Sequence, residues 1–152
     1  MLVRTGTGTD LPVLRRLFRR SSLSNQGDRE TFLAHPESLE FSGRAVAEGR
    51  TRVAVGVDGT IVGFITSAAV GDSEVEVEDL FVDPDRMRQG VGRQLMEDLV
   101  AQARRAAVGR IAVTANPHAE AFYRSVGFVR TRRLGTEFGP AWRMQLALAK
   151  EA

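Results

Sequence analysis

A glycine-rich turn, residues 86–93, is the part of the sequence whose residue types best suit anion binding. It reads RMRQGVGR and lies between an apolar run ending at Val82 and an amphipathic pattern. Because a helix leaves its first N–H groups without partners, its N-terminus is partly positive, and Gly90 and Gly92 allow a ligand close to that backbone. The segment is therefore typical of a phosphate or pyrophosphate site, although a tight strand-to-helix turn would look the same. The cations available there are Arg86, Arg88 and Arg93.

Two other nucleotide sites are excluded by the residues around this turn. A dinucleotide fingerprint requires a third glycine three residues after Gly92, where this chain has Leu95. A P-loop requires Gly-Lys followed by Ser or Thr, and the single lysine is Lys150. The absence of cysteine excludes disulfides, thiolate metal sites and cysteine nucleophiles.

A second motif, NPHAEAFYRSVGF, runs from Asn116 to Phe128. It begins with a helix cap followed by a first-turn proline, and Gly127 ends it. Phe122 and Tyr123 fall on one face of this predicted helix. From the pattern alone, both are candidate core aromatics.

The elements that must position these motifs are read from hydrophobic periodicity. The composition, 43% hydrophobic and 26% charged over 152 residues, predicts one soluble domain, residues 1–152. A helix capped by Thr9 or Asp10 is expected, then a loop over Ser21–Asp28 and a hairpin over Thr51–Val70 around Asp58-Gly59. Further strands are expected at Glu74–Val82, Arg110–Ala115, Phe128–Thr136 and Trp142–Leu148, with helices after Gly92 and after Asn116. This order predicts a mixed α/β sheet with helices on both sides.

The two motifs, in this order and about 25 residues apart, resemble the GNAT superfamily of N-acetyltransferases. The resemblance covers most of the chain from Thr51 onward. It implies a mixed, mostly antiparallel sheet of six to seven strands flanked by helices on both faces. It also implies acetyl transfer from acetyl-CoA, as co-substrate and without a metal, to a primary amine on a small molecule or peptide. We expect a cytoplasmic protein with no nucleic-acid or membrane partner. A homodimer is one possible oligomeric state.

By the same resemblance, specific residues are predicted to hold the cofactor. The pantetheine would lie along Leu80, Phe81 and Val82, where a backbone N–H would bond the thioester oxygen. The pyrophosphate would lie on Arg88, Gln89, Gly90, Val91, Gly92 and Arg93, and Asn116 and Tyr123 would complete the site. Met87 stands where the family pattern has Gln or Arg, and we expect this departure to change affinity rather than abolish binding.

The resemblance also implies the catalytic residues. The acceptor amine is the nucleophile, so the chain needs a base to deprotonate it and an acid for the leaving thiolate. Glu76, six residues before Val82, ranks slightly ahead of Glu78 as the base, and a water chain is the alternative to both. Tyr123 matches the family's acid. A different class of function also stays open, an acyl-CoA-binding module that does not turn its ligand over.

Overall fold

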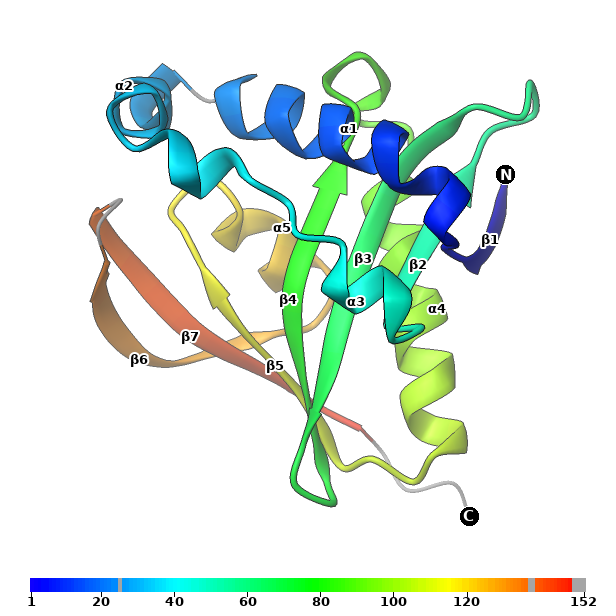
Figure 1. The fold of residues 1–152 in the computed structure, drawn as a ribbon. Helices are drawn as coiled ribbons and strands as arrows, with labels where there is room; N and C mark the ends of the chain where they lie inside the picture. Colours follow the sequence, from blue (N-terminus) through cyan, green and yellow to red (C-terminus); the bar gives the residue numbers. More distant parts are fainter. Residues whose placement is uncertain (25, 137–138, 149–152) are drawn as a thin grey trace. The chain divides into compact units, whose positions relative to one another are not determined.

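The computed structural model describes residues 1–24, 26–136 and 139–148 (Figure 1). The strands there are β1 (Leu2–Thr5), β2 (Thr51–Val55), β3 (Ile61–Val70), β4 (Glu74–Val82), β5 (Arg110–Ala115), β6 (Val129–Thr136) and β7 (Gly139–Ala147). The α-helices are α1 (Leu11–Ser24), α2 (Gln26–Ala34), α3 (Arg44–Ala47), α4 (Val91–Arg105) and α5 (Glu120–Ser125). Short 3-10 turns are η1 (Gly8–Asp10), η2 (Pro36–Leu39) and η3 (Pro84–Arg86).

The strands form a seven-stranded sheet in the order β1-β2-β3-β4-β5-β7-β6, and β4 and β5 pair in parallel. The pairings β1–β2, β2–β3, β5–β7 and β6–β7 are antiparallel. The prediction of a mixed, mostly antiparallel sheet of six to seven strands is therefore confirmed. The predicted hairpin is present, but its turn is longer than the two residues Asp58-Gly59: Gly56 donates its N–H to the Thr60 carbonyl at 2.8 Å, and Gly59 has a φ of 84°.

Two local predictions fail at the N-terminal end. Strand β1 was not predicted, because its four residues, which include Arg4 and Thr5, show no clear alternation of apolar and polar side chains. The strand forms by pairing with β2. Ser21–Asp28 is not a loop in the described residues: α1 continues through Ser24 and α2 begins at Gln26, while Asn25 lies outside the description. Serine favours loops when its hydroxyl competes for the backbone, but here Ser21 donates to the Val82 carbonyl at 2.9 Å.

The chain divides into two compact units, and each is described by itself. The first contains Met1–Thr66 and Asp79–Leu95; the second contains Ser67–Glu78 and the residues from Met96 onward. The core of the first unit includes Leu14 and Leu17 of α1, packed with Phe64 of β3. Phe18, Phe41, Phe64 and Phe81 form a chain of ring contacts, with centroids 4.9–5.6 Å apart. These contacts hold α1 against β3 and β4.

Gly63 allows α4 to approach the opposite face of β3. Successive strand residues point to opposite faces, so Gly63 faces away from the α1 side to which Phe64 points. A Cβ on Gly63 would lie 2.9 Å from the Phe81 carbonyl oxygen, 2.9 Å from Val91 and 3.2 Å from Leu95. In the first unit, helices therefore cover both faces of the sheet, as predicted.

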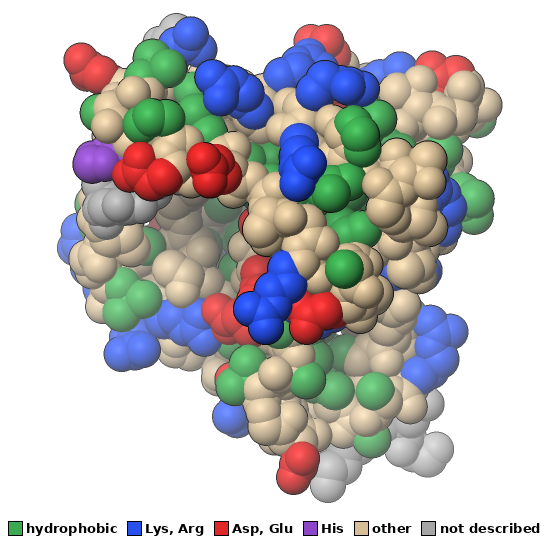
Figure 2. All heavy atoms as spheres, viewed as in Figure 1, with side chains coloured by type: hydrophobic (Ala, Val, Ile, Leu, Met, Phe, Trp, Pro, Cys, Tyr) green, Lys and Arg blue, Asp and Glu red, His purple; other side chains and the backbone are tan. Residues whose placement is uncertain are grey.

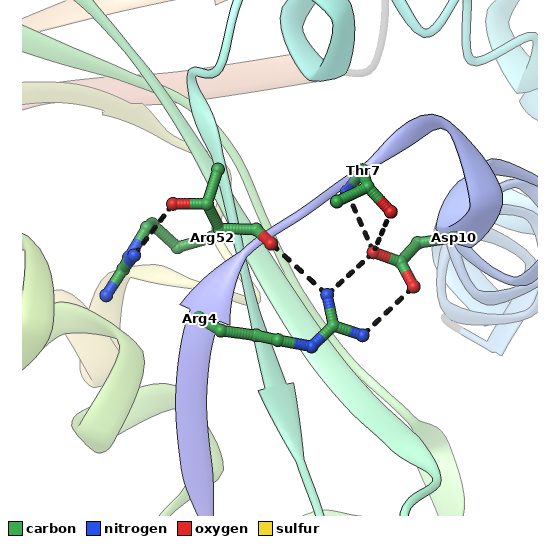
Figure 3. Close-up of polar contacts among 5 residues, drawn as sticks. Arg4, Thr7, Asp10 and Arg52 are labelled. Carbon is green, nitrogen blue, oxygen red and sulfur yellow. Dashed lines mark hydrogen bonds and ion pairs between the residues drawn. The ribbon is translucent and has the colours of Figure 1, made fainter.

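An ion pair joins β1 to the turn that precedes α1 (Figure 3). The guanidinium of Arg4 donates to both carboxylate oxygens of Asp10, at 2.8 and 3.0 Å. The same carboxylate accepts the backbone N–H of Thr7 at 2.8 Å. The Arg4 hydrogen bond, with help from Thr7, lowers the pKa of buried Asp10 to about 2.

This ion pair predicts a pH-dependent contribution to stability. Since the folded pKa is depressed, the stabilisation is complete above the unfolded value near 4 and is lost as pH falls toward 2. At pH 7, Asp10→Asn is expected to lower the free energy of unfolding by about 1–2 kcal/mol, allowing for the partial exposure of Arg4. Urea denaturation of both proteins from pH 7 to 2 should show this difference shrinking. A constant difference would contradict the assignment, and Asp72→Asn, at an exposed turn, is the control.

The second unit contains the parallel β4–β5 ladder and the β6–β7 hairpin. The parallel register runs from Glu74↔Arg110 to Val77↔Val113, and β7 then pairs with β5 from Arg110↔Ala147 to Ala115↔Trp142. Buried side chains come from α4, β4, β5, α5, β7 and the residue before β6: Val77, Met96, Leu99, Ala103, Ile111, Val113, Tyr123, Phe128 and Met144. The polar residues Glu74 and Glu76 lie on the opposite strand face from Val77.

Candidate functional site

The end of β4 is fixed by local hydrogen bonds and by α1. Asp83 donates its N–H to the Val62 carbonyl at 2.8 Å, and its carboxylate accepts the N–H of Asp85 at 2.9 Å. Arg20 bridges the two carboxylates, at 3.3 Å from Asp83 and 3.0 Å from Asp85. The strand therefore ends at a defined position just before the glycine-rich turn.

The turn itself has the backbone geometry expected of an anion site. Gly90 has a φ of 80°, and a Cβ built there would have no heavy atom within 4 Å. The N–H of Gln94 donates to the Gly90 carbonyl, which makes this the first hydrogen bond of α4. The preceding N–H groups, including those of Val91 and Gly92, therefore have no acceptor within the helix and give a partly positive end. This open, glycine-lined helix start fits a pyrophosphate.

Arg88 has a backbone conformation that is unusual for its residue type. Its φ is 65°, in the left-handed region that costs a residue with a Cβ about 1 kcal/mol. The side chain is exposed. Backbone strain of this kind often occurs at functional sites, and here it supports the hypothesis that the Arg88 guanidinium contacts the anion.

The predicted pantetheine strand presents two of its three residues at one edge. Asp83 donates to β3, and backbone groups alternate between edges, so Phe81 also faces β3 whereas Leu80 and Val82 face the other edge. The Phe81 ring packs against Phe18 and Phe64. The Val82 carbonyl accepts the Ser21 hydroxyl, which leaves the Val82 N–H and the backbone of Leu80 as the groups aimed at an added strand.

The two candidate bases are in different environments. Glu76 forms a bidentate ion pair with Arg143, with N–O distances of 2.5 and 2.9 Å. Arg143 also donates to the Thr114 hydroxyl at 3.0 Å, and the hydrogen bonds that it donates to Glu76 raise the pKa of Arg143. Both carboxylate oxygens of Glu76 are therefore engaged by one guanidinium group. Glu78 lies two residues further along the same strand face and is exposed.

Tyr123 and Asn116 are placed by α5 and the turn before it. Tyr123 is 5% exposed, and its ring contacts those of Phe122 and Phe128 at centroid distances of 5.3 and 5.2 Å. The Asn116 side-chain oxygen accepts the N–H of Ala119 at 2.9 Å, so this residue caps the turn that leads into α5. The predicted helix therefore begins later than Asn116, at Glu120.

Two residues at these positions were not found from the sequence. Ser21 occurs in a serine-rich stretch that resembles a loop, and nothing local indicates that its hydroxyl contacts β4. Arg143 is separated from Glu76 by 67 residues, and only the β4–β5–β7 register brings them together. In a chain this rich in arginine, no charge pattern singles out this pair.

Comparison with known proteins identifies the family. A family model described as an acetyltransferase (GNAT) domain matches residues 20–147. The chain belongs to the GNAT acetyltransferase family. This GNAT domain is 31% identical over 127 residues to serotonin N-acetyltransferase 2, chloroplastic, of Oryza sativa subsp. japonica, covering 82% of this chain and 59% of that protein. It is 40% identical over 75 residues to N-alpha-acetyltransferase RimI of Mycobacterium tuberculosis, covering 47% and 48%.

Solved structures show the same fold. The GNAT domain matches Ard1 from Thermoplasma volcanium with a TM-score of 0.76 at 22% identity, covering 98% of both chains. It matches PaiA N-acetyltransferase from Thermoplasma acidophilum, in complex with coenzyme A, with a TM-score of 0.79 at 17% identity, covering 96% and 98%. The chain spans between 26% and 59% of the length of the curated relatives that it matches.

The helices that the structure describes include none long and apolar enough to span a membrane.

Proposed function

We propose that this GNAT domain transfers the acetyl group of acetyl-CoA to a primary amine. The observation that carries the proposal is the start of α4, where Gly90 adopts a φ of 80° beside helix N–H groups that have no partner within the helix. Family membership supports acetyl-CoA as the donor. When bound, acetyl-CoA supplies an acetyl thioester; the chain supplies binding, orientation and proton transfer.

The cofactor-binding residues act mainly through their backbones. The N–H groups at the start of α4 would hold the pyrophosphate, with Arg88 as an additional cation. The edge of β4 formed by Leu80 and Val82 would hold the pantetheine as an added strand, and an N–H there would stabilise the oxyanion. Such a donor is typically worth about 2.7–4 kcal/mol. Ser21 fixes this edge by bonding the Val82 carbonyl.

For the base, we favour Glu78, because both carboxylate oxygens of Glu76 bond Arg143. Glu78→Gln is expected to lower kcat about a hundredfold, since a positioned base typically contributes 10²–10⁴-fold. Glu76→Gln should leave kcat within about threefold and lower the melting temperature, because it leaves Arg143 without its carboxylate. Steady-state kinetics and thermal unfolding of both variants check this. A larger loss of kcat in Glu76→Gln than in Glu78→Gln would indicate Glu76 as the base. Full activity in both variants would favour a water chain as the base.

Tyr123 is proposed as the acid that protonates the departing thiolate. A thiol with a pKa near 8.5 leaves readily, so the contribution should be smaller than that of a typical general acid. Tyr123→Phe is expected to lower kcat about tenfold while keeping the buried ring contacts. Single-turnover rates at saturating acetyl-CoA measure this, and an unchanged rate would remove Tyr123 from the mechanism.

A thiol-release assay over a panel of primary amines tests the function. The expected result is CoA release that depends on one class of amine, together with a rise in melting temperature on adding acetyl-CoA. A rise in melting temperature with no CoA release for any amine would instead indicate a binding module. The exposed Met87, where the family pattern has Gln or Arg, is the observation that keeps this second function in view.

A further inference from the structure

A pocket of about 460 Å³ lies in the first unit, between α1 and the segment 39–42. Its lining combines cationic, apolar and hydroxyl side chains: Arg15, Arg16, Arg19, Leu39, Glu40, Phe41 and Ser42. This volume falls in the range of small-ligand sites. In Figure 2, Lys and Arg side chains gather in the upper part of the view, where α1 runs in Figure 1.

The charge of this pocket is unbalanced. It has three arginines and one glutamate, and in the described parts of the chain Arg15, Arg16 and Arg19 form no ion pair. Arg15 and Arg19 are four residues apart on α1, where like charges destabilise a helix by a few tenths of a kcal/mol. By contrast, Arg44 and Arg124 each have a glutamate four residues away on their own helix. The pocket therefore has more positive than negative charge, three arginines to one glutamate.

The apolar part of the pocket is firmly held. Leu39 is buried, and the Phe41 ring packs against Phe18 and Phe64 at centroid distances of 5.6 and 5.3 Å. Arg15 donates its Nε–H to the Phe41 carbonyl at 3.1 Å, which ties the segment to α1. An anion with methylene groups could place its charge on the arginines and its stem on Phe41.

The same helix also carries residues that contact the end of β4 and the turn after it. Ser21 bonds the Val82 carbonyl and Arg20 bridges Asp83 and Asp85. Arg19 and Ser21 are about 3 Å apart along the axis but lie on different sides of the helix, Arg19 exposed and Ser21 buried. A ligand bound at the arginines would thus be held on the element that meets the end of β4.

We propose that this pocket binds carboxylate groups of the acceptor, so that the substrates are amines that also carry carboxylates, with acidic peptides as the main class. This inference rests on the proposed function in treating the ligand as the acceptor. The guanidinium groups of Arg16 and Arg19 make bidentate hydrogen bonds to a carboxylate, and its methylenes contact Phe41. The Phe41 side chain favours a carboxylate that carries methylene groups over inorganic phosphate, which has none.

The test compares two hexapeptides, one with three acidic residues and one with the corresponding amides, by calorimetric titration without acetyl-CoA at low salt. The acidic peptide is expected to bind at least tenfold more tightly, and this preference should weaken as salt screens the charges. The double variant Arg16→Gln/Arg19→Gln should abolish the preference, and Arg19→Glu should reverse it. Both variants retain the Arg15 bond to Phe41. Arg105→Gln, on exposed α4 surface, should leave the preference unchanged.

Equal binding of the two peptides, or a preference that survives the double variant, would overturn the inference. Free glutamate and inorganic phosphate are the further probes. Glutamate binding that depends on Arg16 and Arg19 would support a small carboxylate-bearing acceptor, whereas phosphate binding as tightly as the acidic peptide would overturn the substrate class. Because these titrations contain no acetyl-CoA, they measure the affinity of the pocket for the peptide even if the protein does not transfer an acetyl group.

Discussion

Gly90→Ala is expected to weaken CoA binding about a hundredfold. At a φ of 80° an alanine is strained, and its Cβ would occupy the open space from which the N–H groups of α4 are approached. The loss of one or two charge-assisted hydrogen bonds, at about 1.5–3 kcal/mol each, corresponds to this factor. Calorimetry with CoA measures the dissociation constant, and the KM for acetyl-CoA should rise in parallel.

Gly59→Ala is the matched control for this prediction. Gly59 has a φ of 84° in the β2–β3 hairpin, and a Cβ there also has no heavy atom within 4 Å. Both alanine variants should lose about 1–2 kcal/mol of stability from the same backbone strain. Only Gly90→Ala should lose CoA affinity. Equal CoA affinities in the two variants would show that the turn does not hold the cofactor.

Gly63→Ala is expected to lower the free energy of unfolding by about 2–3 kcal/mol, the second of the large effects. Its Cβ would lie 2.9 Å from the Phe81 carbonyl oxygen, a backbone atom that cannot rotate away, and 2.9 Å from Val91. Overpacking of this kind typically costs about 1–3 kcal/mol. Because Val91 begins α4, moving it also moves the glycine turn, so CoA affinity should fall as well.

Gly135→Ala provides the comparison on another strand. Gly135 lies in β6, and a Cβ there would have no heavy atom within 4 Å. Urea denaturation should find this variant within about 0.5 kcal/mol of the wild type. If Gly63→Ala were equally benign, the close approach of α4 to β3 would not be needed for stability.

The parts of the fold that could be predicted are those specified by local chemistry. Asp58-Gly59 determines a hairpin through its backbone preferences, and the order of apolar runs predicts the mixed sheet. Strand β1 and the helical segment around Ser21 could not be predicted, because their stability comes from pairing with Thr51–Val55 and from the Val82 carbonyl. These are tertiary contacts that leave no local signal.

The same division holds for the candidate site. The glycine turn was visible because Gly90 and Gly92 stand at a helix start, where N–H groups are left over. The ion pair of Glu76 could not be predicted, because the register of β4, β5 and β7 is what places Arg143 beside it. The ion pair of Glu76 is known only from the fold, and the roles of the base, of the turn and of Tyr123 all stay predictions.

The most direct measurement is a calorimetric titration of the wild-type chain with CoA and, separately, with pantetheine, which lacks the pyrophosphate. We expect micromolar binding of CoA and at least hundredfold weaker binding of pantetheine, because pantetheine has no pyrophosphate for the proposed α4 amides to hold. Equal affinity for the two compounds, or no heat with CoA at millimolar concentration, would contradict it.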